Sequence, residues 1–153
     1  MKVVLGADHA GYEMKQELMA FLSKQGYEIV DVGTDTCDMP SDYPQFAKSM
    51  GDVILSGKAE RGILICGSGV GASIAANKIN GIYAGLCHDT YSAHQGVEHD
   101  RMNVLCIGSR IIGIMLAQEI AMAYLHAEIS NEERHVRRFG MVKAIEADMK
   151  TKP

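Results

Sequence analysis

Gly62-Ile63-Leu64-Ile65-Cys66-Gly67-Ser68-Gly69-Val70-Gly71-Ala72-Ser73-Ile74-Ala75-Ala76-Asn77-Lys78 is the stretch that decides the fold. Its apolar start predicts a buried strand, its alternating glycines predict a turn, and its alanine-rich end predicts a helix. Glycines at such a turn let several backbone N–H groups point into one small space, which suits phosphate, an oxyanion or a thiolate. This setting favours the thiolate form of Cys66, although a cysteine that ends a buried strand is commonly just a small apolar side chain. Whether Cys66 is reactive therefore depends on what the rest of the chain brings beside it.

Composition places the 153 residues, 47% of them hydrophobic and 22% charged, in one globular domain spanning positions 1–153. A formal net charge of −4 gives no electrostatic reason to expect nucleic acid or an anionic membrane as a partner. The chain begins without a leader-like apolar run, and no stretch approaches the roughly 18 apolar residues of a membrane span, so we expect a cytoplasmic protein. Cys37, Cys66, Cys87 and Cys106 are spread singly. This spacing argues against zinc knuckles, thioredoxin-like redox chemistry and a disulfide framework, and predicts free thiols.

Strand and helix patterns alternate along the chain. We expect strands at residues 2–6, 28–32, 62–66, 82–87 and 103–107. Helices are expected after Gly11 as far as Gly26, from Asp42 to Gly57, from the glycine turn to about Lys78, and over residues 90–96, 113–127 and about 131–149. The last helix carries an apolar stripe formed by Val136, Phe139, Val142, Ile145 and Met149. The alternation predicts an α/β fold, a three-layer α/β/α sandwich on a five-stranded parallel, Rossmann-like sheet.

Ligands of such open sheets bind beyond the carboxyl ends of the strands. Four of these ends carry titratable or glycine-rich segments: Asp8-His9, Cys66 to Gly71, His88-Asp89 and Gly108-Ser109-Arg110. Because these loops meet at one rim of a parallel sheet, we expect the active site there.

Dinucleotide binding, cysteine-phosphatase catalysis and metal binding by histidines fit this rim of the sheet poorly. The glycine pattern is G-x-G-x-G after the third strand, with no acidic residue ending the next strand about 20 residues on, so dinucleotide binding is disfavoured. A cysteine phosphatase places an arginine six positions after its cysteine to hold phosphate, and position 72 is alanine. His88, His94 and His99 match no common metal-ligand spacing.

An enzyme that moves a proton between adjacent carbons of a small phosphorylated sugar fits better. It needs a base near C1 and C2, donors for a developing enediolate oxygen, a group that opens the sugar ring, and cations for the phosphate. Cys66 is the candidate base. The candidate oxyanion donors are Ser68 and the N–H groups of Gly67, Gly69, Val70 and Gly71.

The remaining parts come from the second half of the chain. His99 lies in Glu98-His99-Asp100, which we expect to be a polar loop, and a histidine suits ring opening near neutral pH. Arg134 and Arg138 are spaced i, i+4 on one face of the last helix and are candidate phosphate ligands. Histidines and arginines in such places are also often only solvated.

These residues resemble the type B ribose-5-phosphate isomerases and the related galactose-6-phosphate isomerase subunits over nearly the whole chain. Four motifs carry the resemblance: Gly6-Ala7-Asp8-His9-Ala10-Gly11; Asp42-Tyr43-Pro44; Ile65-Cys66-Gly67-Ser68-Gly69-Val70-Gly71 with Ala75-Ala76-Asn77-Lys78; and Arg134-His135-x-x-Arg138. The resemblance implies an aldose–ketose isomerase that works through an enediolate without a metal or other cofactor. It implies Cys66 as proton acceptor with Ser68 beside it, and His99 as ring-opening proton donor. It further implies homodimers or tetramers with shared sites, and substrate contacts from Asp8, His9, Tyr43, Gly67, Ser68, Gly69, Val70, Gly71, Asp100, Arg110, Arg134 and Arg138.

Two positions depart from the family pattern. Ser68 stands where threonine is common, which keeps the hydroxyl. The usual H-N-D-A-N before the fifth strand is His99-Asp100-Arg101-Met102-Asn103 here. An asparagine both donates and accepts hydrogen bonds, whereas an ionised aspartate only accepts, so contacts to a sugar hydroxyl differ. We expect ribose 5-phosphate as substrate, with tetrulose 4-phosphate, allose 6-phosphate and galactose 6-phosphate as alternatives. A non-catalytic phosphate-binding module and one subunit of a two-subunit isomerase are the competing interpretations.

Overall fold

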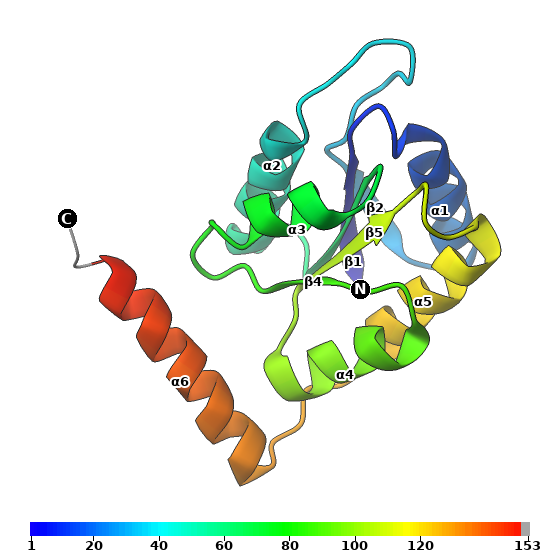
Figure 1. Cartoon of the computed structure of the whole chain (residues 1–153). Coiled ribbons are helices and arrows are strands. Elements are labelled where there is room, and N and C mark those ends of the chain that lie inside the picture. Colours follow the sequence, from blue (N-terminus) through cyan, green and yellow to red (C-terminus); the bar gives the residue numbers. More distant parts are fainter. Residues whose placement is uncertain (151–153) are drawn as a thin grey trace.

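The computed structural model describes residues 1–150, with the backbone alone for 149 and 150. Strands and helices alternate as the sequence predicts (Figure 1). Along the chain they are β1 (Lys2–Ala7), α1 (Tyr12–Lys24), β2 (Glu28–Asp31), α2 (Tyr43–Leu55), β3 (Arg61–Cys66), α3 (Val70–Ala76), β4 (Ala84–Leu86), α4 (Thr90–Asp100), β5 (Val104–Gly108), α5 (Ile114–His126) and α6 (Glu133–Lys150). Within residues 1–150, no helix has the length and apolar character needed to cross a bilayer.

The sheet has the order β2-β1-β3-β5-β4, and every pairing is parallel. Its three central strands are almost wholly buried, whereas the edge strands β2 and β4 are partly exposed. Continuous apolar runs such as Gly62–Cys66 are what a strand covered on both faces requires. The chain reverses its direction of travel across the sheet between β1 and β3, and crevices at such points are where open α/β sheets bind ligands.

Two apolar cores lie on opposite faces of the sheet. On one face Val3 and Leu5 of β1 pack with side chains of α1, α4 and α5. On the other face Val4 packs with side chains of α2 and α3. This alternation follows from the period of two in a strand, which sends neighbouring side chains to opposite faces. The three-layer α/β/α sandwich predicted from the sequence is thereby confirmed.

Helix α6 lies outside both layers and extends away from the sheet (Figure 1). The apolar stripe predicted for this helix is mostly exposed within one chain. Val136, Val142 and Ile145 are exposed, and only Phe139 is half-buried, with its ring centroid 5.0 Å from that of Tyr83. The side chain of Met149 lies outside the described residues. Among the described side chains of the stripe, Phe139 therefore packs inside the protomer while Val136, Val142 and Ile145 stay exposed.

Helix α6 is attached to the rest of the protein near its C-terminal end by hydrogen bonds to Glu146. The Glu146 carboxylate accepts hydrogen bonds from Gly81 N at 2.6 Å and from Tyr83 Oη at 3.1 Å. Burial, with the Glu146 contact second, raises the pKa of Tyr83 above its ordinary value, so the phenol stays a donor in this pair.

Most boundaries differ slightly from the predicted ones, and the difference at the end of α4 moves a candidate residue. Helix α4 runs to Asp100 instead of Gly96, so His99 lies in its last turn and not in a loop. Gly96 does not end the helix. It makes room for Met102, whose Sδ would lie 3.1 Å from a Cβ at that position. The helix ends at Arg101, which adopts the left-handed conformation with φ 56°. Strand β4 is also shorter than predicted, because it covers Ala84–Leu86 and not residues 82–87.

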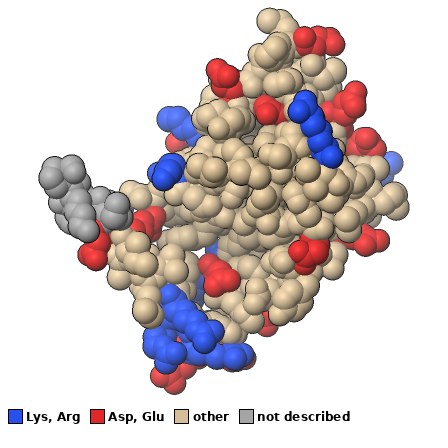
Figure 2. All heavy atoms as spheres, in the orientation of Figure 1, with Lys and Arg blue, Asp and Glu red and all other residues tan. Residues whose placement is uncertain are grey.

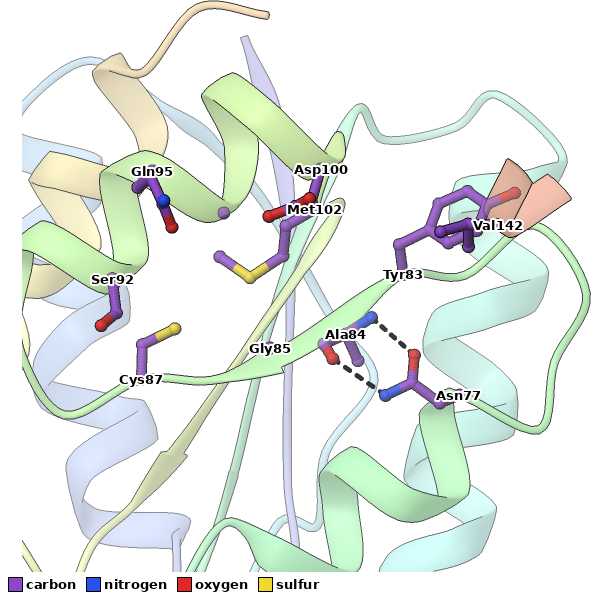
Figure 3. A pocket seen from close by; sticks show the side chains of 11 residues that line it. Asn77, Tyr83, Ala84, Gly85, Cys87, Ser92, Gln95, Asp100, Met102 and Val142 are labelled. Carbon is purple, nitrogen blue, oxygen red and sulfur yellow. Dashed lines mark hydrogen bonds between the residues drawn. The ribbon is translucent and has the colours of Figure 1, made fainter. Parts of the chain in front are cut away.

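Strand β4 has its outer edge covered at Ala84. The Asn77 amide donates to Ala84 O at 2.8 Å and accepts from Ala84 N at 2.9 Å, so one side chain stands in for a neighbouring strand (Figure 3). This contact joins the end of α3 to the edge of the sheet.

Candidate active site

Cys66 ends β3 and enters the glycine turn. Gly69 has φ 79°, in the left-handed region that favours glycine, and this conformation directs its N–H at the Cys66 sulfur, 3.0 Å away. An amide donor aimed at the sulfur stabilises negative charge there. The Cys66 side chain is only 5% exposed, but it lines a cavity of about 370 Å³ at the carboxyl ends of the strands. Cys66 thus borders a space that a small molecule can enter, while most of its side chain packs in the core below.

The glycines of this turn are required by close neighbours. A Cβ at Gly69 would lie 2.4 Å from the Leu86 side chain, and one at Gly71 would lie 2.7 Å from the Tyr43 ring. The Tyr43 ring consequently packs directly on the backbone of the turn and forms one wall of the cavity. Ser68 lines the same cavity, and its hydroxyl accepts a hydrogen bond from Val70 N at 3.3 Å.

The loop after β1 is held in place by its own side chains. Asp8 is buried, and its carboxylate accepts from the N–H groups of Ala10 and Gly11 at 3.0 and 3.1 Å. His9 makes a reciprocal pair with Ser41: His9 N donates to Ser41 Oγ at 2.9 Å, and Ser41 N donates to His9 Nδ1 at 3.1 Å. Because Nδ1 accepts a hydrogen bond, a neutral His9 carries its proton on Nε2 and can donate from there.

The loop after β5 closes the site from a third side. Ser109 N donates to Cys66 O at 2.9 Å, and Arg110 N donates to Gly67 O at 3.0 Å. Ser109 Oγ also donates to Ala10 O at 2.7 Å, which ties this loop to the one after β1. The Arg110 side chain passes over the glycine turn, since a Cβ at Gly67 would lie 3.4 Å from its Nη1. Arg110 therefore supplies positive charge beside the candidate oxyanion donors.

The structure brings most of the predicted site residues together and leaves four elsewhere. Those lining the cavity are Asp8, His9, Tyr43, Cys66, Gly67, Ser68, Gly71 and Arg110. Gly69 and Val70 contribute through their backbone N–H groups. His99, Asp100, Arg134 and Arg138 do not line this cavity. Sequence reasoning missed Ser41, because its contacts with His9 join segments that are far apart in the chain. It placed Ser109 at the rim but did not predict the hydrogen bond from its hydroxyl to Ala10 O.

The four remaining residues belong to the region where α4 meets α6. His99 stacks on His135, with ring centroids 3.9 Å apart, and Arg134 pairs with Glu132 at 2.8 Å. Figure 2 shows basic side chains gathered over the N-terminal part of α6, where the sequence has Arg134, Arg137 and Arg138. The side chains of these three arginines are exposed to solvent.

Asp100 points into a different cavity, of about 430 Å³, between β4, α4 and α6 (Figure 3). Its neighbours there include Cys87 and Met102. Burial, with the nearby Asp89 charge second, raises the pKa of Cys87 to about 11. A thiol with that pKa stays protonated near neutral pH and is a poor nucleophile.

The segment after β4 has a structural role. Asp89 caps α4, accepting from Ser92 N at 2.7 Å, and this backbone hydrogen bond is the main reason that the pKa of Asp89 lies below its ordinary value. His88 Nε2 accepts from Gly108 N at 2.9 Å, so its ring holds the end of β5. The prediction that this strand end supplies active-site chemistry therefore has no support, since neither residue lines the Cys66 cavity. Within residues 1–150, no three His, Cys, Asp or Glu side chains gather as a metal site would require.

The fold and this cavity define a class of protein: an α/β/α sandwich with a thiol and an arginine at the crevice beside its central strands. The family model described as ribose/galactose isomerase matches residues 3–142. Escherichia coli ribose-5-phosphate isomerase B is 42% identical over 145 residues, covering 95% of this chain and 96% of that protein. A D-erythrulose-4-phosphate isomerase of Pectobacterium atrosepticum is 40% identical over 128 residues, 84% of each chain. The solved structure of Clostridium thermocellum ribose-5-phosphate isomerase B superposes with a TM-score of 0.94 at 42% identity, covering 97% of this chain and 99% of that one. The chain belongs to the ribose/galactose isomerase family.

Proposed function

We propose that this protein is an aldose–ketose isomerase that interconverts ribose 5-phosphate and ribulose 5-phosphate, as a single domain over residues 1–153 in the cytoplasm. The observation that carries the proposal is Cys66, which lines a cavity and whose sulfur receives an N–H donor 3.0 Å away. Family membership and the identity to isomerases of phosphorylated sugars support the reaction class. The absence of disulfides among the described cysteines is consistent with a reducing compartment.

In the proposed reaction the Cys66 thiolate takes the C2 proton of the open-chain aldose. The electron pair of that C–H bond forms the C1–C2 double bond of an enediolate, and the C1 carbonyl oxygen gains negative charge. The N–H groups of the glycine turn and the Ser68 hydroxyl stabilise this charge because they are fixed before reaction. The thiol then returns the proton to C1 while a proton moves from O2 to O1, which completes the ketose.

The ends of the substrate are held by charged side chains in this proposal. His9 presents Nε2–H to a sugar or phosphate oxygen, and Arg110 adds positive charge beside the glycine turn. Arg134 and Arg138 bind the phosphate, since guanidinium groups pair well with phosphate oxygens. His99 opens the furanose ring before isomerisation begins.

This assignment needs a second copy of the chain, because one protomer holds Cys66 and the residues of α6 in separate places. Exposed apolar side chains flank both groups. Val70, Ile74 and Tyr91 lie near the glycine turn and the start of α4, and Val136, Met141, Val142 and Ile145 lie along α6. A two-fold dimer would cover both surfaces and would create two equivalent sites at once. We therefore propose a homodimer, or a tetramer built from it, with shared sites.

The proposal is tested with the purified single chain. Ribose 5-phosphate should be converted to ribulose 5-phosphate in deuterated water with deuterium incorporated at carbon. A protein that binds phosphosugars and incorporates no deuterium would be a binding module, and a chain active only with an added second polypeptide would be one subunit of a two-subunit enzyme.

Substrate choice is the second part of the test. Asp100 replaces the usual family asparagine, and the P. atrosepticum relative is named for a four-carbon substrate. A panel of phosphorylated tetroses, pentoses and hexoses, ranked by kcat/KM, decides between ribose 5-phosphate and the alternatives tetrulose 4-phosphate, allose 6-phosphate and galactose 6-phosphate. A higher kcat/KM for a tetrulose 4-phosphate would replace the pentose assignment and keep the reaction class.

A further inference from the structure

His135 differs from its neighbours on α6. Between residues 133 and 148 it is the only buried side chain, at 3% exposure, while Arg134 and Arg138 on either side are exposed. An amphipathic helix that packs on a core buries a whole stripe of side chains. Here a single imidazole is buried, at the point where α6 meets α4.

Three contacts fix the position of the His135 ring. It stacks on His99 with an angle of 27° between the ring planes and 3.9 Å between the centroids. Its Nδ1 lies 2.9 Å from Ser130 Oγ. The N–H of Ser130 in turn donates to Glu98 O at 2.9 Å, in the last turn of α4. The ring of His135 is thus held against the turn that carries His99.

His99 itself has few other restraints. Its Nε2 lies 3.8 Å from the Glu98 carboxylate, which is beyond hydrogen-bonding distance, and Glu98 also lies 3.4 Å from His94. The His99 side chain remains 27% exposed. One face of the ring is covered by His135 while its edge stays accessible.

We propose that His135 is a positioning residue that holds the His99 ring, through the stack, in the orientation needed to open the sugar ring. The inference rests on the proposed function. In ring opening the proton of the anomeric O1 leaves, the C1–O4 bond breaks as the C1 carbonyl forms, and a proton is delivered to O4. One imidazole can do both only if its nitrogens stay in line with two oxygens of the substrate. A partly exposed histidine without the stack would sample several rotamers.

Ring opening can be measured apart from isomerisation, because the 5-hydroxyl of ribulose 5-phosphate is esterified and that ketose cannot close a five-membered ring. Exchange of a C1 hydrogen of ribulose 5-phosphate with solvent deuterium therefore needs enediolate formation and no ring opening. Turnover of ribose 5-phosphate, which is mostly cyclic, needs both. His135→Ala should lower kcat for ribose 5-phosphate by about tenfold, the scale of one lost aromatic pair, and should leave the C1 exchange rate near that of the wild type.

Two further variants separate the stack from the hydrogen bond to Ser130. His135→Phe keeps an aromatic plane against His99 and should retain most of the ribose 5-phosphate turnover. His135→Asn keeps a polar group near Ser130 without a ring and should behave like His135→Ala. Arg137→Ala, two positions further along and exposed on α6, is the matched control and should match the wild type in both assays.

The outcomes are distinct. An equal fall in both rates for His135→Ala would mean that His135 only holds α6 in place, and unchanged rates would remove its role, so either result overturns the inference. Rescue by asparagine and not by phenylalanine would do the same, because the hydrogen bond would then be the important contact. A wild-type protein that does not isomerise ribose 5-phosphate at all would instead refute the proposed function, and this inference with it.

Discussion

Two inactive variants should restore activity when they are combined, because each proposed site takes residues from two chains. Cys66→Ala removes the base and leaves His99 intact, whereas His99→Asn removes the ring-opening group and leaves Cys66 intact. In a mixed dimer one site receives both lesions, and the other receives the intact Cys66 of one chain and the intact His99 of its partner. The proposed shared site therefore predicts one working site in every mixed dimer.

The expected recovery follows from counting dimers. Random exchange of equal amounts of the two variants makes about half of the dimers mixed, and one of their two sites works, so activity should approach about one quarter of the wild-type value. The assay is ribose 5-phosphate turnover after joint unfolding and refolding, with each variant refolded alone as the blank. Refolded wild type mixed with Cys66→Ala controls for losses during refolding. If the mixed sample stays as inactive as either variant while mixed dimers are present, the reasoning about shared sites is refuted.

Two variants, Cys66→Ala and Gly71→Ala, and two properties of Cys87 have expected results. Cys66→Ala should lower kcat by at least about 10²-fold, as loss of a general base does, with an unchanged circular dichroism spectrum; full turnover would exclude Cys66 as the base. Gly71→Ala places a Cβ 2.7 Å from the Tyr43 ring, which should push that ring into the cavity and raise KM, and steady-state kinetics showing an unaltered KM would contradict this packing. The pKa of Cys87 is raised from 9.0 to about 11, so iodoacetamide near neutral pH should label the exposed Cys37 well before Cys87, as peptide mapping can show. The unfolded chain loses the Cys87 proton first, so the free energy of unfolding should fall as the pH rises from 9.0 towards about 11.

The sheet and the glycine turn could be predicted because their signals are local. Ile63-Leu64-Ile65 is an unbroken apolar run, which is typical of a central strand in a parallel sheet covered on both faces. Gly69 adopts the positive φ that the spacing of glycines suggests. Loops that follow parallel strands share one edge, so Asp8, Cys66 and Arg110 could be placed together from sequence order alone.

Other features depended on contacts that no local pattern reveals. The end of α4 was misplaced because a glycine inside a helix looks like a stop, whereas Gly96 serves the packing of Met102, and Arg101 takes the left-handed position in its place. The pairing of His9 with Ser41 spans 32 positions of sequence. The apolar stripe of α6 was recognised as a pattern, but within one chain Phe139 packs on Tyr83 and Val136, Val142 and Ile145 remain exposed.

Asn77 has a consequence for how copies of this chain can associate. An uncovered edge of a sheet invites another strand to add to it, and such addition has no natural end point. By occupying both backbone groups of Ala84, the amide blocks that addition at the first residue of the edge strand β4. Growth of the sheet from one molecule into the next is thereby discouraged at this edge, which agrees with the proposal that two copies meet through their helices and form a closed pair.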